Sequence, residues 1–67
     1  MKKTKYIIHC PSGYLSEIRY ERNDPRLPYA VFAVNKKKAA KFSFKELCYK
    51  VLRILGIDKE LCLIEEL

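Results

Sequence analysis

The chain has no tryptophan, only two glycines and a single histidine among its 67 residues. Two isolated glycines exclude a glycine-rich phosphate loop, which needs several residues without side chains close together. One histidine and three scattered cysteines, with no C-x-x-C pair, are a poor set of zinc ligands. Nucleophilic catalysis also needs a base and a group that orients it. We therefore expect no enzyme activity, no cofactor and no metal site.

The three cysteines, Cys10, Cys48 and Cys62, are spaced too widely to suggest a particular pair. Each has apolar neighbours, so we expect buried free thiols of the kind found in a reducing cytosol. A disulfide between two of them is the alternative. His9 precedes Cys10, but successive residues of a strand point to opposite faces, so a catalytic pair is not expected.

No apolar run is long enough to cross a membrane or to serve as an export signal. The charged start of the chain is followed only by Tyr6, Ile7 and Ile8 before His9 interrupts, whereas a membrane span needs about 20 apolar residues. We therefore expect a cytoplasmic protein with no membrane partner.

The chain is rich in apolar residues and in positive charge. Apolar residues make up 49% of it, which is enough for one small domain over residues 1–67. The net charge is +6, of which residues 1–57 carry +9 and residues 58–67 carry −3. A surface of this sign favours acidic partners, either nucleic acid or an acidic protein.

The strongest local pattern predicts one amphipathic helix over residues 42–57. Ser43 has the hydroxyl of a good N-cap, and Glu46, three residues later, completes a capping box. Gly56 suits the left-handed conformation that ends a helix. Apolar residues at helical spacing form a stripe that should face the core. The stripe consists of Phe44, Leu47, Cys48, Val51, Leu52 and Leu55.

Segments rich in aromatic and β-branched residues predict strands over residues 5–10, 14–22 and 29–35. The sequence Pro-Ser-Gly before Tyr14 predicts a turn that joins the first two as a hairpin. In the second strand, simple alternation places Leu15 and Ile18 on opposite faces. Residues 61–67 predict a last strand, and a short helix capped by Asp58 is the alternative.

Together these elements predict an α+β fold. It is a small two-layer sandwich in which one main helix packs on an antiparallel sheet of three to four strands, in the order β-β-β-α-β. The helix should cover one face of the sheet. Ile7, Leu15 and either Tyr29 or Val31 should lie on the other face, where they would offer a contact surface to a second copy.

Positive charge is densest over residues 36–41, where Asn35 can cap a short helical turn. We expect these lysines to lie beside the N-terminus of the main helix, whose dipole and free N–H groups favour an anion. An arginine in the stiff, proline-flanked loop over residues 23–28 is a further contact for an acidic partner or a phosphate backbone. The candidate binding residues are Lys36, Lys37, Lys38, Lys41, Lys45 and Arg26.

The passage from the third strand to the helix resembles the end of a double-stranded RNA-binding domain, a family with a K-K-x-A-K element at the start of its last helix. Lys36, Lys37 and Ala39 match this element, whereas Ala40 stands in place of lysine and Lys41 comes one position late. The first helix of that family has no counterpart here. The resemblance implies phosphate contacts from the matching lysines.

Size, charge and the passage A-V-F-A-V-N-K-K-K-A-A-K-F also resemble, in type, the small lysine-rich α+β accessory proteins of bacteriophages and other mobile elements. Many of these proteins bind host machinery, including nucleases of defence systems. This resemblance implies a regulator or inhibitor that docks on a host protein in the host cytoplasm.

Three functions follow from these observations, and none is enzymatic. The first expectation is a protein that docks on a host protein, such as a nucleic-acid-processing or defence enzyme. The alternative is a nucleic-acid-binding module that uses Lys36–Lys41 and the start of the main helix, with an affinity that falls steeply with salt. The third is a structural subunit that forms a homodimer through the open sheet face or an edge strand.

Overall fold

The computed structural model describes residues 4–24 and 26–67 and confirms the predicted α+β fold, in which two short 3-10 turns, one on each side of the helix, are added to the predicted elements. The strands are β1 (Tyr6–Cys10), β2 (Gly13–Tyr20), β3 (Pro28–Ala33) and β4 (Leu63–Glu66). The main helix α1 spans Lys45–Leu55, and two short 3-10 turns, η1 and η2, span Lys36–Lys38 and Lys59–Leu61. In the described part of the chain, no helix is long and apolar enough to cross a membrane.

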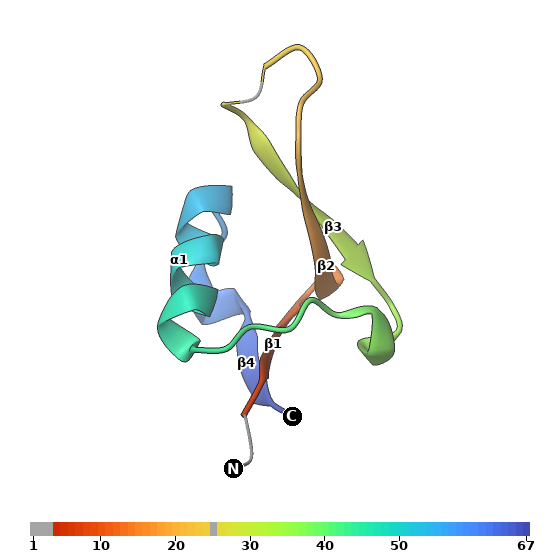
Figure 1. The fold of residues 1–67 in the computed structure, drawn as a ribbon, viewed down its shortest axis with the longest axis vertical. Helices are drawn as coiled ribbons and strands as arrows, with labels where there is room; N and C mark the ends of the chain where they lie inside the picture. Colours follow the sequence, from red (N-terminus) through yellow and green to blue (C-terminus); the bar gives the residue numbers. More distant parts are fainter. Residues whose placement is uncertain (1–3, 25) are drawn as a thin grey trace.

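The four strands form one antiparallel sheet in the order β3-β2-β1-β4, with α1 on one face (Figure 1). β1 pairs with β4 along most of its length but with β2 only at His9 and Cys10. β2 then turns away with β3, and the two strands rise past the end of α1 as a projecting hairpin (Figure 1). This hairpin gives the molecule its elongated extents of 42 × 22 × 22 Å.

A glycine makes the tight connection between β1 and β2 possible. Gly13 has φ of +129°, and a Cβ at this position would lie 2.8 Å from the carbonyl oxygen of Ala33 on β3. A side chain would therefore be strained by the backbone angle and would also meet backbone that cannot rotate away. The glycine lets β1, β2 and β3 come together at one point.

A β-bulge at the start of β2 decides which of its side chains enter the core. The register shifts between Leu15, which faces Phe32, and Glu17, which faces Val31. The extra residue reverses the alternation, so Leu15 and Ile18 both pack in the core on the side of α1. The prediction that they lie on opposite faces is wrong, because simple alternation does not allow for the bulge.

The core lies between the sheet and α1. Its buried members are Ile8, Cys10, Leu15, Cys48, Val51, Leu52 and Cys62. Ile7 is also buried, on the other side of β1, with 1% of its surface exposed. Ile7 and Leu15 are therefore not available for the open apolar contact face that the sequence predicted.

The predicted capping box does not form. α1 begins at Lys45, its N-cap is the extended residue Phe44, and this residue makes no side-chain capping hydrogen bond. Ser43 Oγ instead accepts a hydrogen bond of 3.2 Å from Lys5 Nζ. The predicted start of the helix is wrong because Phe42 is held in an extended bridge with β1.

Only part of the predicted apolar stripe of α1 faces the core. Cys48, Val51 and Leu52 are buried, whereas Phe44 and Leu47 are 65% and 41% exposed. Phe44 lies outside the helix, so helical spacing does not govern the direction of its side chain.

The predicted helix end is confirmed: Gly56 has φ of +71°, and its N–H donates to the carbonyls of Arg53 and Leu52.

The last segment combines both structures considered for it. Asp58 Oδ1 accepts a hydrogen bond of 2.9 Å from the backbone N–H of Glu60 and so caps η2. β4 follows and pairs with β1, which confirms the predicted last strand over Leu63–Glu66. The short helix considered as the alternative is present as one 3-10 turn before it.

Candidate binding surface

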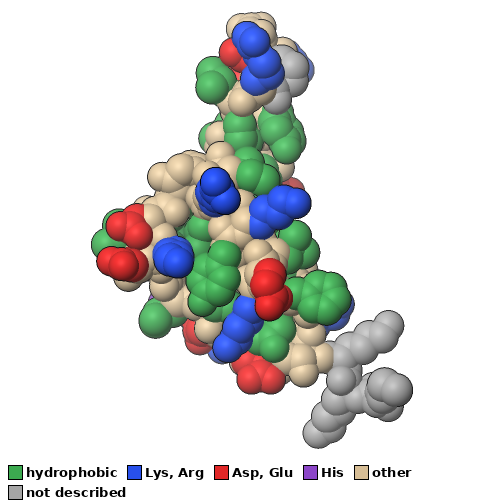
Figure 2. Space-filling model, turned by 90° about the vertical axis from the view of Figure 1, so that its left-hand side faces the viewer, with side chains coloured by type: hydrophobic (Ala, Val, Ile, Leu, Met, Phe, Trp, Pro, Cys, Tyr) green, Lys and Arg blue, Asp and Glu red, His purple; other side chains and the backbone are tan. Residues whose placement is uncertain are grey.

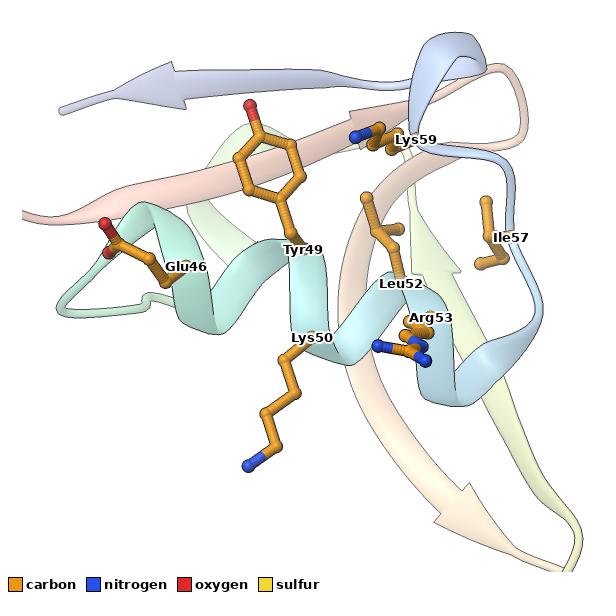
Figure 3. Close-up of a pocket in the computed structure, with 7 residues that line it drawn as sticks. All are labelled: Glu46, Tyr49, Lys50, Leu52, Arg53, Ile57 and Lys59. Atoms are coloured by element: carbon orange, nitrogen blue, oxygen red, sulfur yellow. The ribbon is translucent and has the colours of Figure 1, made fainter.

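An open groove of about 620 Å³ lies between the outer side of α1 and η2 (Figure 3). We call it the basic groove, because three of its residues are cationic and one is acidic. Its lining residues are Glu46, Tyr49, Lys50, Leu52, Arg53, Ile57 and Lys59.

Helical spacing and the turn at Gly56 build the groove. Tyr49 and Arg53 are four residues apart in α1, so they stand one above the other on the same side of the helix. Gly56 reverses the chain and brings Lys59 back over the helix, with its Nζ 5.7 Å from the centre of the Tyr49 ring. Figure 3 shows these two side chains facing one another, whereas Lys50 points away from the ring.

The cations of the groove have no acidic partner of their own. In residues 4–24 and 26–67, no carboxylate lies within ion-pair distance of Lys50, Arg53 or Lys59. The distance of Lys59 from the Tyr49 ring is that of a cation–π contact, which leaves the ammonium free to bind an anion as well. The groove therefore carries a net positive charge beside an exposed aromatic ring.

A second hollow, of about 500 Å³, is lined by residues of β3, of the turn between β1 and β2, and of the chain at and after the end of α1. We call it the apolar hollow, and its lining includes Pro28, Phe32, Leu55, Ile57 and Leu61. Ile57 lines both the hollow and the basic groove, so the two adjoin at this residue. Figure 2 looks onto α1 and shows Lys and Arg side chains, with several Asp and Glu side chains, spread among hydrophobic ones on this side.

The lysine turn, η1 (Lys36–Lys38), lies on the side of the sheet away from α1. Asn35 Oδ1 accepts a hydrogen bond of 2.9 Å from the N–H of Lys37, which confirms the predicted cap of η1. Lys36 Nζ lies 3.7 Å from Glu65 Oε1. Glu65 pairs across the sheet with Ile7, whereas its neighbour Ile64 packs in the core, so Glu65 faces away from α1. η1 and α1 accordingly lie on opposite sides of β1 (Figure 1).

The remaining predicted contact residues lie elsewhere. Lys41 is exposed in the segment that joins η1 to α1. Lys45 opens α1, with its Nζ 5.9 Å from the centre of the Tyr6 ring. Arg26 lies at the tip of the hairpin, where its Nε is 3.3 Å from Asp24 Oδ1. The structure thus divides the six candidate residues among separate regions instead of gathering them beside the start of α1.

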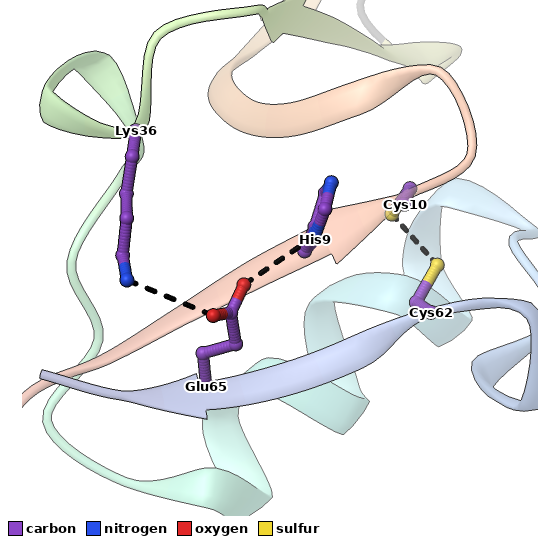
Figure 4. A network of polar contacts seen from close by, with 5 residues as sticks. All are labelled: His9, Cys10, Lys36, Cys62 and Glu65. Atoms are coloured by element: carbon purple, nitrogen blue, oxygen red, sulfur yellow. Dashed lines mark hydrogen bonds and ion pairs between the residues drawn. The ribbon is translucent and has the colours of Figure 1, made fainter.

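A polar cluster surrounds Glu65 on the face away from α1 (Figure 4). His9 Nδ1 lies 3.4 Å from Glu65 Oε2, and its ring stacks on that of Tyr14 with centroids 4.2 Å apart. Cys10 packs in the core, so His9 and Cys10 point to opposite faces, as predicted. The described residues include no group of three or more His, Cys, Asp or Glu side chains placed to hold a metal.

All three cysteines are free and buried, as predicted. Cys10 Sγ and Cys62 Sγ are in contact at 2.7 Å (Figure 4). Burial is the main cause that raises the pKa of Cys10 to about 12, and the hydrogen bond with Cys62 raises this pKa further. Burial also raises the pKa of Cys48. Cys10 and Cys48 are therefore protonated at neutral pH.

Sequence reasoning missed Arg53 and Lys59 as binding residues. Lys59 belongs to the acidic end of the chain, which made it an unlikely member of a positive site by composition alone. The sequence signal for these two residues was the spacing of Tyr49 and Arg53 away from the apolar stripe, followed by the helix end at Gly56.

Comparison of the chain with protein families, with characterised proteins and with solved structures finds no match.

Proposed function

We propose that the protein is a non-enzymatic binding protein that docks on an acidic, amphipathic segment of another protein. The observation that carries this proposal is that the basic groove and the apolar hollow adjoin at Ile57. Acidic side chains of the partner would contact Arg53 and Lys59, and an apolar side chain beside them would fill the hollow. Charge complementarity would orient the segment, and apolar burial would hold it.

The residues of this surface favour a protein partner over a nucleic-acid partner. A phosphate backbone is best matched by a continuous track of cations, but the hollow next to the groove is lined by Pro28, Phe32 and Leu55. Tyr49 is the single aromatic ring of the groove, whereas binding of single strands uses several rings for successive bases. An amphipathic protein segment uses both halves of the surface.

The type-level resemblance to accessory proteins of bacteriophages supports a regulatory or inhibitory role. In that role, the partner would be a host protein, such as a nucleic-acid-processing or defence enzyme, with an acidic segment that this chain covers. The protein would act by occupying that segment and would need no reactive group.

Chemical-shift mapping by NMR tests the proposal with synthetic probes. The isotope-labelled chain is titrated with a peptide that carries Leu on one helical face and Glu on the other, and with a scrambled peptide of the same composition. We expect the first peptide to shift the signals of Tyr49, Arg53, Ile57 and Lys59 and to bind several-fold more tightly than the scrambled one. Equal binding of both peptides, or shifts confined to residues outside the basic groove and the apolar hollow, would overturn the proposal.

Two charge-reversal variants separate the groove from general charge. Arg53→Glu/Lys59→Glu should weaken peptide binding by about tenfold or more. Lys37→Glu/Lys38→Glu changes the net charge equally, on the other side of the sheet, and should leave binding within about twofold. A titration with duplex RNA or DNA completes the test. Duplex binding that depends on Lys37 and Lys38, without peptide binding, would favour the nucleic-acid alternative.

A further inference from the structure

Two cysteines that are far apart in the sequence face one another at the end of the β1–β4 pairing. His9 and Leu63 form a register pair of the two strands, and Cys10 and Cys62 are the next residues in each direction. Their sulfur atoms lie 2.7 Å apart, although 52 positions separate the residues. Both are buried, with 5% and 8% of their surfaces exposed. The third cysteine, Cys48, lies on α1.

We propose that Cys10 and Cys62 form a reversible intramolecular disulfide on reaction with a low-molecular-weight disulfide such as oxidised glutathione. A disulfide needs a sulfur–sulfur distance of about 2 Å, so the two thiols have less than about 1 Å to move. Residues that face one another across antiparallel strands have Cβ atoms at about the separation that a disulfide spans, and Cys10 and Cys62 come directly after the last such pair, His9 and Leu63. The bond would fasten the end of η2 to the end of β1.

The exchange balances without any other reactant. One cysteine thiol loses its proton and attacks the reagent as the thiolate, so that a mixed disulfide forms and one reagent thiolate leaves and takes up a proton. The second cysteine thiolate then attacks the protein sulfur of the mixed disulfide, forms the Cys10–Cys62 bond and releases the second reagent thiolate. Two electrons pass from the protein to the reagent. The protons of the two protein thiols end on the two reagent thiols.

The disulfide reagent can reach the two thiols from the side of Cys10. This residue lines both the apolar hollow and a smaller hollow of about 240 Å³, where it lies with His9, Pro11 and Leu63. A small opening of Leu61, which lines both hollows and is 64% exposed, would admit the reagent. Neither Cys62 nor Cys48 lines these hollows, so we expect Cys10 to take part in the first contact.

The full chain, incubated with oxidised glutathione, tests the proposal by mass spectrometry after the remaining thiols are alkylated. The cross-linked protein should lose two hydrogen atoms in mass, and trypsin should release peptide 6–19 joined to peptide 60–67. Cys48→Ala should keep this cross-link, and Cys62→Ala should abolish it. The bond should raise the thermal midpoint by at least about 10 °C, because it closes a long loop, and dithiothreitol should reverse this shift.

Three results would overturn the proposal: mixed disulfides with glutathione only, a cross-link that includes Cys48, or a Cys10–Cys62 cross-link that forms in urea but not in buffer. Circular dichroism establishes whether each variant is folded. Should Cys62→Ala fail to fold, the peptide map of the unmodified sequence and of Cys48→Ala decides the question alone. The proposal does not rest on the docking function, and peptide binding has no bearing on this test.

Discussion

Phe42 and Tyr6 exchange two backbone hydrogen bonds, each 2.8 Å long, and this bridge sets where α1 begins. Phe42 is held beside β1 as an extended residue, and Phe44 remains extended with φ of −139° and ψ of 146°. Ser43, between them, directs its hydroxyl to Lys5 instead of to the first turn of the helix. A long-range pairing thus overrides a good local capping signal.

The position of Ser43 predicts that it contributes little to stability. Ser43→Ala should lower the free energy of unfolding by less than about 0.5 kcal/mol, because no helix N–H loses its partner. Asp58→Ala should cost about 1 kcal/mol, since Asp58 caps η2. Urea unfolding measures both. A loss for Ser43→Ala as large as that for Asp58→Ala would show that Ser43 does cap the helix.

Two positions in α1 should differ strongly in how much stability the protein loses when each is changed to alanine. Leu52 is 1% exposed in the core, so Leu52→Ala should lower the free energy of unfolding by about 3 kcal/mol through the cavity it leaves. Ile54 is exposed two residues later, and Ile54→Ala should cost less than about 0.5 kcal/mol. Equal losses in urea unfolding would contradict the observed packing face of the helix.

The two glycines should differ in their response to alanine. Both have positive φ, but a Cβ at Gly13 would meet the backbone of Ala33, whereas a Cβ at Gly56 would meet nothing within 4 Å. Gly56→Ala should therefore cost only the conformational penalty of about 1–2 kcal/mol, and Gly13→Ala about 3 kcal/mol or more. Thermal and urea unfolding of both variants test this order, and the reverse order would contradict the close approach of β1, β2 and β3.

The raised pKa of Cys10 predicts a loss of stability at alkaline pH. Burial, with a further contribution from Cys62, moves this pKa from the ordinary value of 9.0 to about 12 in the folded protein. Between these values the unfolded chain binds fewer protons than the folded one, so the free energy of unfolding falls as pH rises. The contribution is fully present below pH 9.0 and is lost by about pH 12.

Urea unfolding under reducing conditions, on either side of pH 9.0, measures this effect. The slope from Cys10 should approach about 1.4 kcal/mol per pH unit within the window. Cys10→Val removes the thiol and serves as the control for tyrosine and lysine titration in the same range. An identical pH dependence in the variant would show that Cys10 does not contribute.

Local chemistry was sufficient to predict the type and the order of the secondary structure elements of this protein. Aromatic and β-branched segments became strands, Asn35 and Asp58 capped their turns, and Gly56 ended α1. Each of these features depends on residues within a few positions of one another, and such contacts can be recognised in the sequence. The fold class followed because the order of the elements leaves few ways to pack them.

The tertiary contacts account for the features that the sequence did not reveal. The bulge that turns both Leu15 and Ile18 into the core depends on how β3 pairs with β2. The start of α1 depends on the bridge between Phe42 and Tyr6, which are distant in the sequence. The basic groove depends on the return of Lys59 across α1, and the thiol contact depends on the pairing of β1 with β4. These features arise from chain segments that meet only after folding, so no local pattern encodes them.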